Sequence, residues 1–191
     1  MSTQHDTGTR AHGTAHDDTV HPDLITLGRE RSSLADKVWG LTRIALGSVF
    51  LWAFVDKLFG LGFATPSERS WLSGGSPTSG FLGGVEGPFS GIYTAIAGQA
   101  WADWLFMLGL LGIGVALMAG VAMRFAAAAG SLLLVLMWTA VLPMTNHPFL
   151  DDHLVYAMVL VGLALSGAGR TFGLGGRWEQ LSIVKKNPVL R

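Results

Sequence analysis

The chain contains no cysteine among its 191 residues, and this absence excludes several kinds of chemistry at once. Disulfides, thiolate catalysis, cysteine-ligated iron–sulfur clusters and covalently attached c-type haem all need the missing sulfur. Any redox reaction of this chain therefore has to use another carrier.

Charge is scarce as well. Charged residues make up 14% of the chain and hydrophobic residues 50%, whereas an ordinary soluble domain is roughly 25% charged. The 13 basic and 13 acidic side chains cancel, and no basic stripe is present that could follow a nucleic acid backbone. The composition predicts a protein of the lipid bilayer and no nucleic acid partner.

Several cofactor motifs are also missing. No GxGxxG or P-loop pattern occurs in the strand-to-helix context it needs, and no HExxH pattern suggests a metal. Buried haem requires facing histidines inside a bundle, whereas the apolar segments contain only His153, near one end. We therefore expect no haem, flavin, iron–sulfur cluster or metal in this chain.

What the sequence does contain is long apolar segments. A segment of about 20 residues spans the ~30 Å hydrocarbon core as a helix, because only a helix satisfies its own backbone in lipid. Gly, Ser and Pro residues, and Arg124 alone, separate the segments. The sequence predicts an all-α membrane protein, a four-transmembrane-helix bundle with helices at about 38–60, 101–123, 125–143 and 151–169.

The remaining segments are expected outside the bilayer. Residues 1–37 read as a disordered tail with too few large apolar residues to pack, and no cleaved secretory signal is expected. Residues 170–191 read as an interfacial tail. Basic residues, among them Arg43 at the opening of the first segment, concentrate in and beside both tails, so the positive-inside rule places both termini in the cytoplasm. The loop 61–99 is then extracytoplasmic, and its aromatic residues predict a lid with a short helix within 88–97.

Polar side chains gather near the expected outer ends of these helices. Asp56 and Lys57 close the first segment, Asp103 opens the second, and Asp152 and His153 open the fourth. A charge costs ~2.5–3.5 kcal/mol at the centre of a membrane helix and less near its ends. A shared outer pocket would let these groups neutralise one another, and Tyr156 lies on the same helical face as Asp152 and His153.

Each group also has a simpler interpretation. Asp103, and Asp152 or its neighbour Asp151, can cap a helix N-terminus. Lys57 can extend to the lipid headgroups, with Asp56 as its local counter-charge. The sequence alone leaves these alternatives open.

The runs "GGSPTSGFL", "NHPFLDDHLVYAMVLVGLAL" and "AGRTFGLG" with "RWE" resemble the DoxX/DoxD-like membrane proteins over about residues 38–179. That family includes the membrane subunit of thiosulfate:quinone oxidoreductase. The resemblance implies a bacterial or archaeal plasma membrane protein that works with a second subunit in a redox complex. Such a complex oxidises thiosulfate or another sulfur compound and reduces quinone.

On this hypothesis an outer pocket binds the quinone. Lys57, Trp104 and Tyr156 would contact it, and Lys57 with Arg69 would bind an anionic substrate. Two other functions stay open: a non-catalytic scaffold that recruits a partner enzyme, and a small transporter. The groups expected to exchange protons with quinol are Asp56, Asp103, Asp152 and His153.

Overall fold

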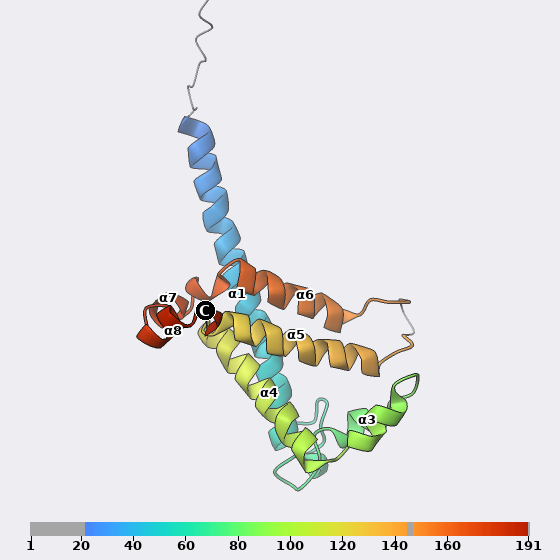
Figure 1. Ribbon diagram of the computed structural model, residues 1–191. Helices are drawn as coiled ribbons and strands as arrows, with labels where there is room; N and C mark the ends of the chain where they lie inside the picture. Colours follow the sequence, from blue (N-terminus) through green and yellow to red (C-terminus); the bar gives the residue numbers. More distant parts are fainter. Residues whose placement is uncertain (1–21, 145–146, 191) are drawn as a thin grey trace, which may run out of the picture.

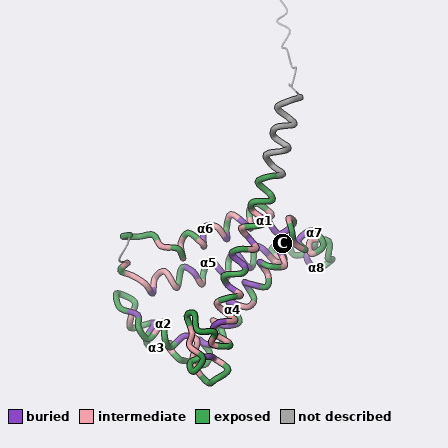
Figure 2. Tube along the Cα trace, turned by 180° about the vertical axis from the view of Figure 1, so that it is seen from behind, coloured by how far each residue is buried: buried purple, intermediate pink, exposed green. Residues whose placement is uncertain are grey.

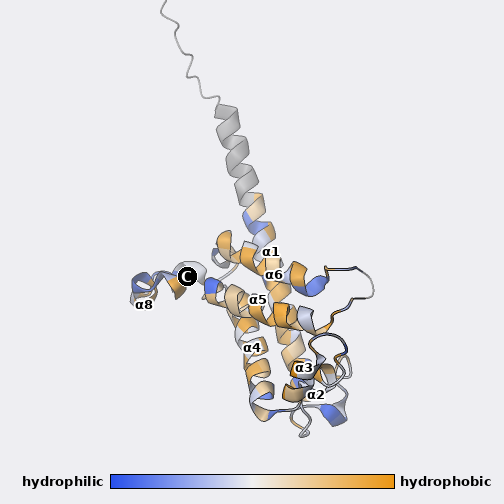
Figure 3. Cartoon of the chain, turned by 45° about the vertical axis from the view of Figure 1, so that its right-hand side comes forward, coloured by the Kyte–Doolittle hydropathy of each residue, from blue (hydrophilic) through white to orange (hydrophobic). Residues whose placement is uncertain are grey.

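The computed structural model describes residues 22–144 and 147–190, and every regular element within them is a helix (Figure 1). Hydrophobic residues run along the long helices (Figure 3). The expected all-helical class is confirmed for this part of the chain. The long helices are α1 Pro22–Phe59, α4 Ala100–Ala119, α5 Met123–Ala140 and α6 Asp152–Leu165.

Three of these helices are long and apolar enough to cross a membrane: α4, α5 and the Leu34–Phe59 part of α1. Helix α6 has 14 residues, which at a rise of 1.5 Å per residue gives about 21 Å, less than the ~30 Å hydrocarbon core. The structure thus supports a helical membrane protein with three candidate spans. A fourth span is not shown.

Three helices end earlier than the sequence predicted. Helix α4 ends before Gly120, whose φ of 72° forms a left-handed C-cap. Helix α5 ends at Ala140, three residues before Pro143, because a proline disfavours helical backbone in the residue before it. Helix α6 ends at Leu165, two residues before Gly167 turns left-handed with φ of 66°.

Helix α1 differs in the other direction, because it begins at Pro22 and not at residue 38. Residues 22–37 are therefore helical rather than disordered. Proline is favoured in the first turn of a helix, and lengthening an existing helix avoids the cost of nucleating a new one. The predicted disorder of residues 1–21 lies outside the described residues.

The long helices pack as two pairs, α1 against α4 and α5 against α6. Helices α4 and α5 meet at their short connection and diverge from it (Figure 1). Buried positions lie where the helices face one another (Figure 2). The central core contains Leu46, Phe50, Met107, Leu110, Ile113, Leu117, Met123, Leu134, Leu160 and Leu163.

The bundle has two distinct ends. We call the end at residues 120–122, between α4 and α5, the hairpin end, and the end covered by residues 61–99 the lid end. The lid contains η1 Ser67–Arg69, α2 Ser79–Leu82 and α3 Ser90–Ile96. The short helix expected within residues 88–97 is therefore present as α3.

The C-terminal tail folds back on the hairpin end. It contains η2 Ala168–Arg170, α7 Gly175–Trp178, α8 Ser182–Lys186 and η3 Pro188–Leu190. Two hydrogen bonds close it: the Trp178 indole N–H donates to the Leu190 carbonyl at 2.6 Å, and Arg124 donates to the Pro188 carbonyl at 2.9 Å.

Candidate functional site

The lid is fixed to the helices by two buried acids. Asp56 on α1 is 2% exposed. Its carboxylate accepts hydrogen bonds from the backbone N–H groups of Phe63 at 3.3 Å and Ala64 at 3.1 Å. A carboxylate that accepts two backbone donors is stable in a buried place, so Asp56 holds the first turn of the lid against α1.

Asp103 on α4 likewise holds a later segment of the lid against the helices. One of its oxygens accepts three hydrogen bonds, from the Ser76 hydroxyl at 2.8 Å and from the Thr78 N–H and hydroxyl at 3.0 and 2.6 Å. The Thr78 hydroxyl also accepts the Gly98 N–H at 3.1 Å. The start of α2 and the end of the lid are thereby tied to one carboxylate.

Two further contacts dock the lid on α5. The Tyr93 hydroxyl of α3 donates to the Leu136 carbonyl at 2.8 Å and lies 2.5 Å from the Thr139 hydroxyl. Gly87 has a φ of 115°, and a Cβ there would lie 2.2 Å from the Leu142 carbonyl oxygen. Only glycine allows this approach of the lid to the end of α5.

A basic cavity of about 490 Å³ lies within the lid. Lys57 and Arg69, the two predicted anion-binding residues, both line it together with Ser76. Next to Arg69, the Ser67 hydroxyl donates to Glu68 at 2.8 Å and thereby lowers the pKa of the Glu68 carboxyl. The structure thus brings the two predicted cations to one place, beside a residue that also binds Asp103.

A second cavity, of about 270 Å³, is almost entirely apolar. It lies between α4 and α5 where they diverge, and α2 and α3 cover it. We call it the apolar cavity. Its walls include Phe81 and Leu82 of α2, Tyr93 and Ile96 of α3, Trp101, Leu105 and Phe106 of α4, and Leu133, Leu136 and Met137 of α5.

The two cavities share a wall. Pro77 and Phe81 line both of them. In addition, the Lys57 ammonium lies 6.0 Å from the ring centroid of Phe106, which itself lines the apolar cavity. A cation at this distance from an aromatic face is attracted to it. A polar compartment and an apolar compartment therefore adjoin across a thin layer of side chains.

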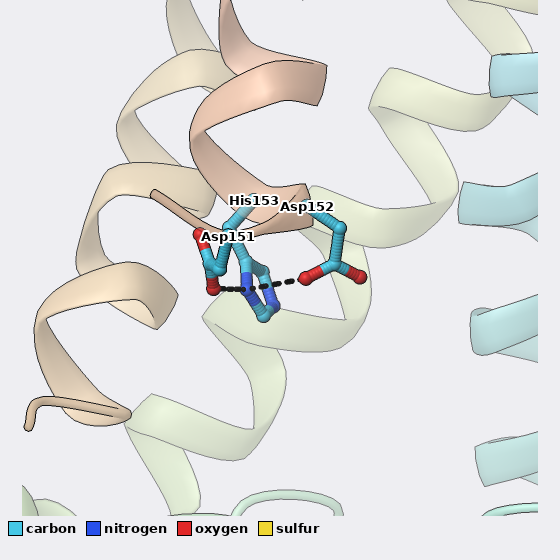
Figure 4. Close-up of side chains that lie close together, drawn as sticks. All are labelled: Asp151, Asp152 and His153. Atoms are coloured by element: carbon cyan, nitrogen blue, oxygen red, sulfur yellow. Dashed lines mark hydrogen bonds and ion pairs between the residues drawn. The ribbon is translucent and has the colours of Figure 1, made fainter. Parts of the chain in front are cut away.

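Asp151, Asp152 and His153 form a separate group at the start of α6 (Figure 4). Asp151 caps the helix, because its carboxylate accepts the Leu154 N–H at 3.2 Å. Nδ1 of His153 lies 2.6 Å from the Asp151 carboxylate and 3.5 Å from that of Asp152, whose side chain is 69% exposed. The capping interpretation thus applies to Asp151.

One ligand atom of each of these three residues lies within 4.8 Å of the others, which is close enough for a metal ion. Clusters of exposed acids are common without one, and Asp151 is already engaged as a cap. The sequence expectation of no metal stays a prediction.

The predicted single outer site is therefore divided. In the described part of the chain, no hydrogen bond or ion pair joins Asp56, Asp103 and the 151–153 group. Asp103, Lys57 and Arg69 gather around the lid, and Asp56 anchors its first turn, while Asp152 and His153 stand apart at the start of α6. Helix α6 packs mainly on α5, which explains the separation.

The two predicted aromatic contacts lie in different surroundings. Trp104 is 57% exposed, and its ring meets that of Trp71 edge-on with centroids 4.7 Å apart. Tyr156 is half-buried against the central core. Neither residue lines the apolar cavity, so the structure offers Trp101 and Phe106 as the aromatic neighbours of a ligand there.

Sequence reasoning missed the role of Arg43, which it read as a charge flanking the first helix. The Arg43 side chain is 0% exposed and donates to five backbone carbonyls. These acceptors lie at the end of α4 and around η2: Leu117, Met118 at 2.9 Å, Ala168 at 3.2 Å, Thr171 at 3.1 Å and Phe172 at 3.0 Å. Arg43 thus joins α1 to the hairpin end.

Glycines leave room for this guanidinium. A Cβ on Gly120 or on Gly173 would lie 3.1 or 3.0 Å from an Arg43 nitrogen. The glycine-rich run around residues 167–176 indicates that another part of the chain approaches its backbone closely. The run alone does not indicate that this part is the Arg43 side chain.

Comparison with protein-family models, with curated proteins and with solved structures gives no match for this chain. The resemblance to the DoxX/DoxD-like proteins therefore stays a prediction from the quoted runs.

Proposed function

We propose that the chain is a membrane subunit that binds a quinone in the apolar cavity and acts with a partner protein in a redox complex. The observation that carries this proposal is the cavity itself. It opens between two apolar helices, where a lipid-soluble molecule can enter, and it adjoins a basic compartment.

The size and lining of the apolar cavity suit a quinone ring. Ligand sites are mostly apolar with a few placed polar groups. Trp101 and Phe106 offer aromatic faces, and Thr78 offers a polar group beside the buried Asp103. The hydroxyl and the N–H of Thr78 both donate to Asp103, so the indole N–H of Trp101, which also lines the cavity, would donate to a quinone carbonyl.

The basic cavity supports an anionic electron donor. Lys57 and Arg69 would hold a small oxyanion such as thiosulfate. Oxidation of two thiosulfate ions to tetrathionate forms one sulfur–sulfur bond and releases two electrons. A quinone takes up those two electrons and two protons to become quinol, so the reaction balances without a further oxidant.

The proposal includes a topology. The basic residues of the two tails would place both termini in the cytoplasm and the lid outside. Helix α6, with the residues on either side of it, would then make the fourth crossing of a bacterial or archaeal plasma membrane. Sites for the partner would lie on the tails or the lid.

Binding of decylubiquinone to the purified full-length protein in detergent micelles tests the proposal, with quenching of tryptophan fluorescence as the readout. Leu105→Trp places a large ring in the cavity wall and should weaken binding about tenfold or more. Leu108→Trp is the matched control, because Leu108 is also exposed on α4 but does not line the cavity.

Equal binding by both variants and the parent protein would exclude the apolar cavity as the site. If the parent protein binds no quinone but co-purifies with a stable partner, the scaffold function replaces this one. Exposed Leu181 and Ile183 beside Lys185 and Lys186 would suit such docking.

A further inference from the structure

A polar pocket of about 260 Å³ lies at the hairpin end, away from the lid and both cavities described above. It is formed by the start of α5, the end of α6 and the folded tail. Arg124 and Arg170 line it, with Ser166, Trp178 and Glu179. We call it the arginine pocket.

The charge of the arginine pocket is positive. Arg170 donates to the Glu179 carboxylate through two nitrogens, at 2.6 Å for the shortest contact, which raises the pKa of Arg170. Arg124 pairs with no carboxylate in the described part of the chain and uses one nitrogen on the Pro188 carbonyl. Because a guanidinium has five N–H donors, Arg124 keeps donors for an anion.

An apolar groove of about 400 Å³ runs along the same two helices. On α6 it is lined by Leu154, Met158 and Val161, and the next turn brings Leu165 to the arginine pocket. At 1.5 Å per residue, Leu154 and Leu165 lie about 16 Å apart along the helix.

Helix α5 shows the same progression. Ser131 and Val135 line the groove, and Arg124, two helical turns before Ser131, lines the pocket. Residues at this spacing share one face of a helix. One continuous face of the α5–α6 pair is thus polar and basic at the hairpin end and apolar beyond it.

We propose that this face binds one anionic phospholipid, with its phosphate in the arginine pocket and an acyl chain in the α5–α6 groove. The basic end of the face would bind the anionic headgroup, and the apolar groove beyond it would bind the acyl chain. Leu165, which is 84% exposed between pocket and groove, would contact the chain next to the headgroup.

The surroundings favour an anionic over a zwitterionic headgroup. The tail adds the basic residues Arg177, Lys185 and Lys186 at the same end, all exposed. Basic residues near a membrane surface attract anionic lipids, while a guanidinium can bind a phosphate through two parallel hydrogen bonds. The basic tail would raise the local concentration of anionic lipid, and the arginine pocket would bind one lipid headgroup.

Native mass spectrometry of the full-length protein in micelles, titrated with phosphatidylglycerol or phosphatidylcholine of equal chain length, tests the proposal. We expect phosphatidylglycerol to bind about tenfold more tightly, because both lipids offer a phosphate but the choline cation of phosphatidylcholine would be repelled by the positive pocket. Arg124→Gln should remove this preference. Lys37→Gln should keep it, because Lys37 is exposed on α1 and does not line the pocket.

A groove variant separates a lipid from a free phosphate. Val161→Trp should weaken phosphatidylglycerol binding severalfold, whereas Val155→Trp, equally exposed on α6 but outside the groove, should not. Millimolar inorganic phosphate should fail to displace the lipid. Equal affinity for both lipids, an unchanged Arg124→Gln variant, or displacement by phosphate would each overturn the proposal.

Discussion

The hydroxyl of Thr78 donates a hydrogen bond of 2.6 Å to the carboxylate of Asp103, although 25 positions separate the two residues in the chain. The same oxygen also accepts the N–H of Thr78 and the hydroxyl of Ser76. A charged residue in the first turn of a long apolar helix thus serves as the anchor of the lid, and the wall between the two cavities depends on it.

Asp103→Ala should therefore loosen the lid. It leaves three donors without their acceptor, and hydrogen bonds to a charged group contribute about 1.5–3 kcal/mol each. We expect a loss of at least about 2 kcal/mol in the free energy of unfolding and faster proteolysis between residues 61 and 99. Asp103→Asn, which keeps an acceptor oxygen, should lose less.

Asp152→Ala is the control for this comparison, since its side chain is 69% exposed. It should change the midpoint of thermal unfolding in micelles by no more than a degree or two. A larger effect from Asp152 than from Asp103 would contradict the anchoring role.

The sequence indicated, from position alone, that acids lie near one end of the predicted helices. It could not indicate their partners. The groups that satisfy Asp56 are backbone N–H groups of Phe63 and Ala64, which every residue type possesses. Composition therefore predicted ion pairs between charged side chains, whereas in the structure the Asp56 carboxylate accepts hydrogen bonds from the backbone of the lid.

Tyr93→Phe should release α3 from α5 while keeping the aromatic ring in the apolar cavity. The variant loses the hydroxyl contacts to Leu136 and Thr139. A neutral buried hydrogen bond contributes about 1 kcal/mol, so the midpoint of thermal unfolding should fall slightly and amide exchange in α3 should rise. Thr94→Val should leave exchange at the α3–α5 contact unchanged, because Thr94 bonds only within its own helix.

Arg43 should be among the positions least tolerant of substitution. Arg43→Met leaves five carbonyls without their donor, and we expect a loss of about 2–5 kcal/mol. Arg43→Lys should be intermediate, because an ammonium has three donors and no planar fork. For both variants, the measurements are the yield of folded protein in membranes and the midpoint of thermal unfolding. Lys37→Met, on the exposed part of α1, is the control.

Arg43 also shows why some of the fold escapes sequence reasoning. Basic residues near the start of an apolar segment usually mark the membrane surface, and Arg43 was read in that way with its neighbours. Its burial depends on glycines about 80 and 130 positions later that leave space for it. The presence and approximate length of each helix follow from the local sequence pattern. The fit of one side chain against residues far away in the chain is seen only in the folded structure.

The neighbouring glycines of α7 give a sharp test of the packing around this site. Gly175 is buried, and a Cβ there would lie 2.6 Å from the carbonyl carbon and oxygen of Gly169, so the backbone of one segment would have to move. Gly175→Ala should cost about 1–3 kcal/mol, as overpacking does. Gly176 has open space around its Cβ position, so Gly176→Ala should be neutral or stabilise by about 0.4–1 kcal/mol through the unfolded chain. The test is to compare the midpoints of thermal unfolding of the two variants in the same detergent. Equal midpoints would show that the tail does not pack on η2 as described.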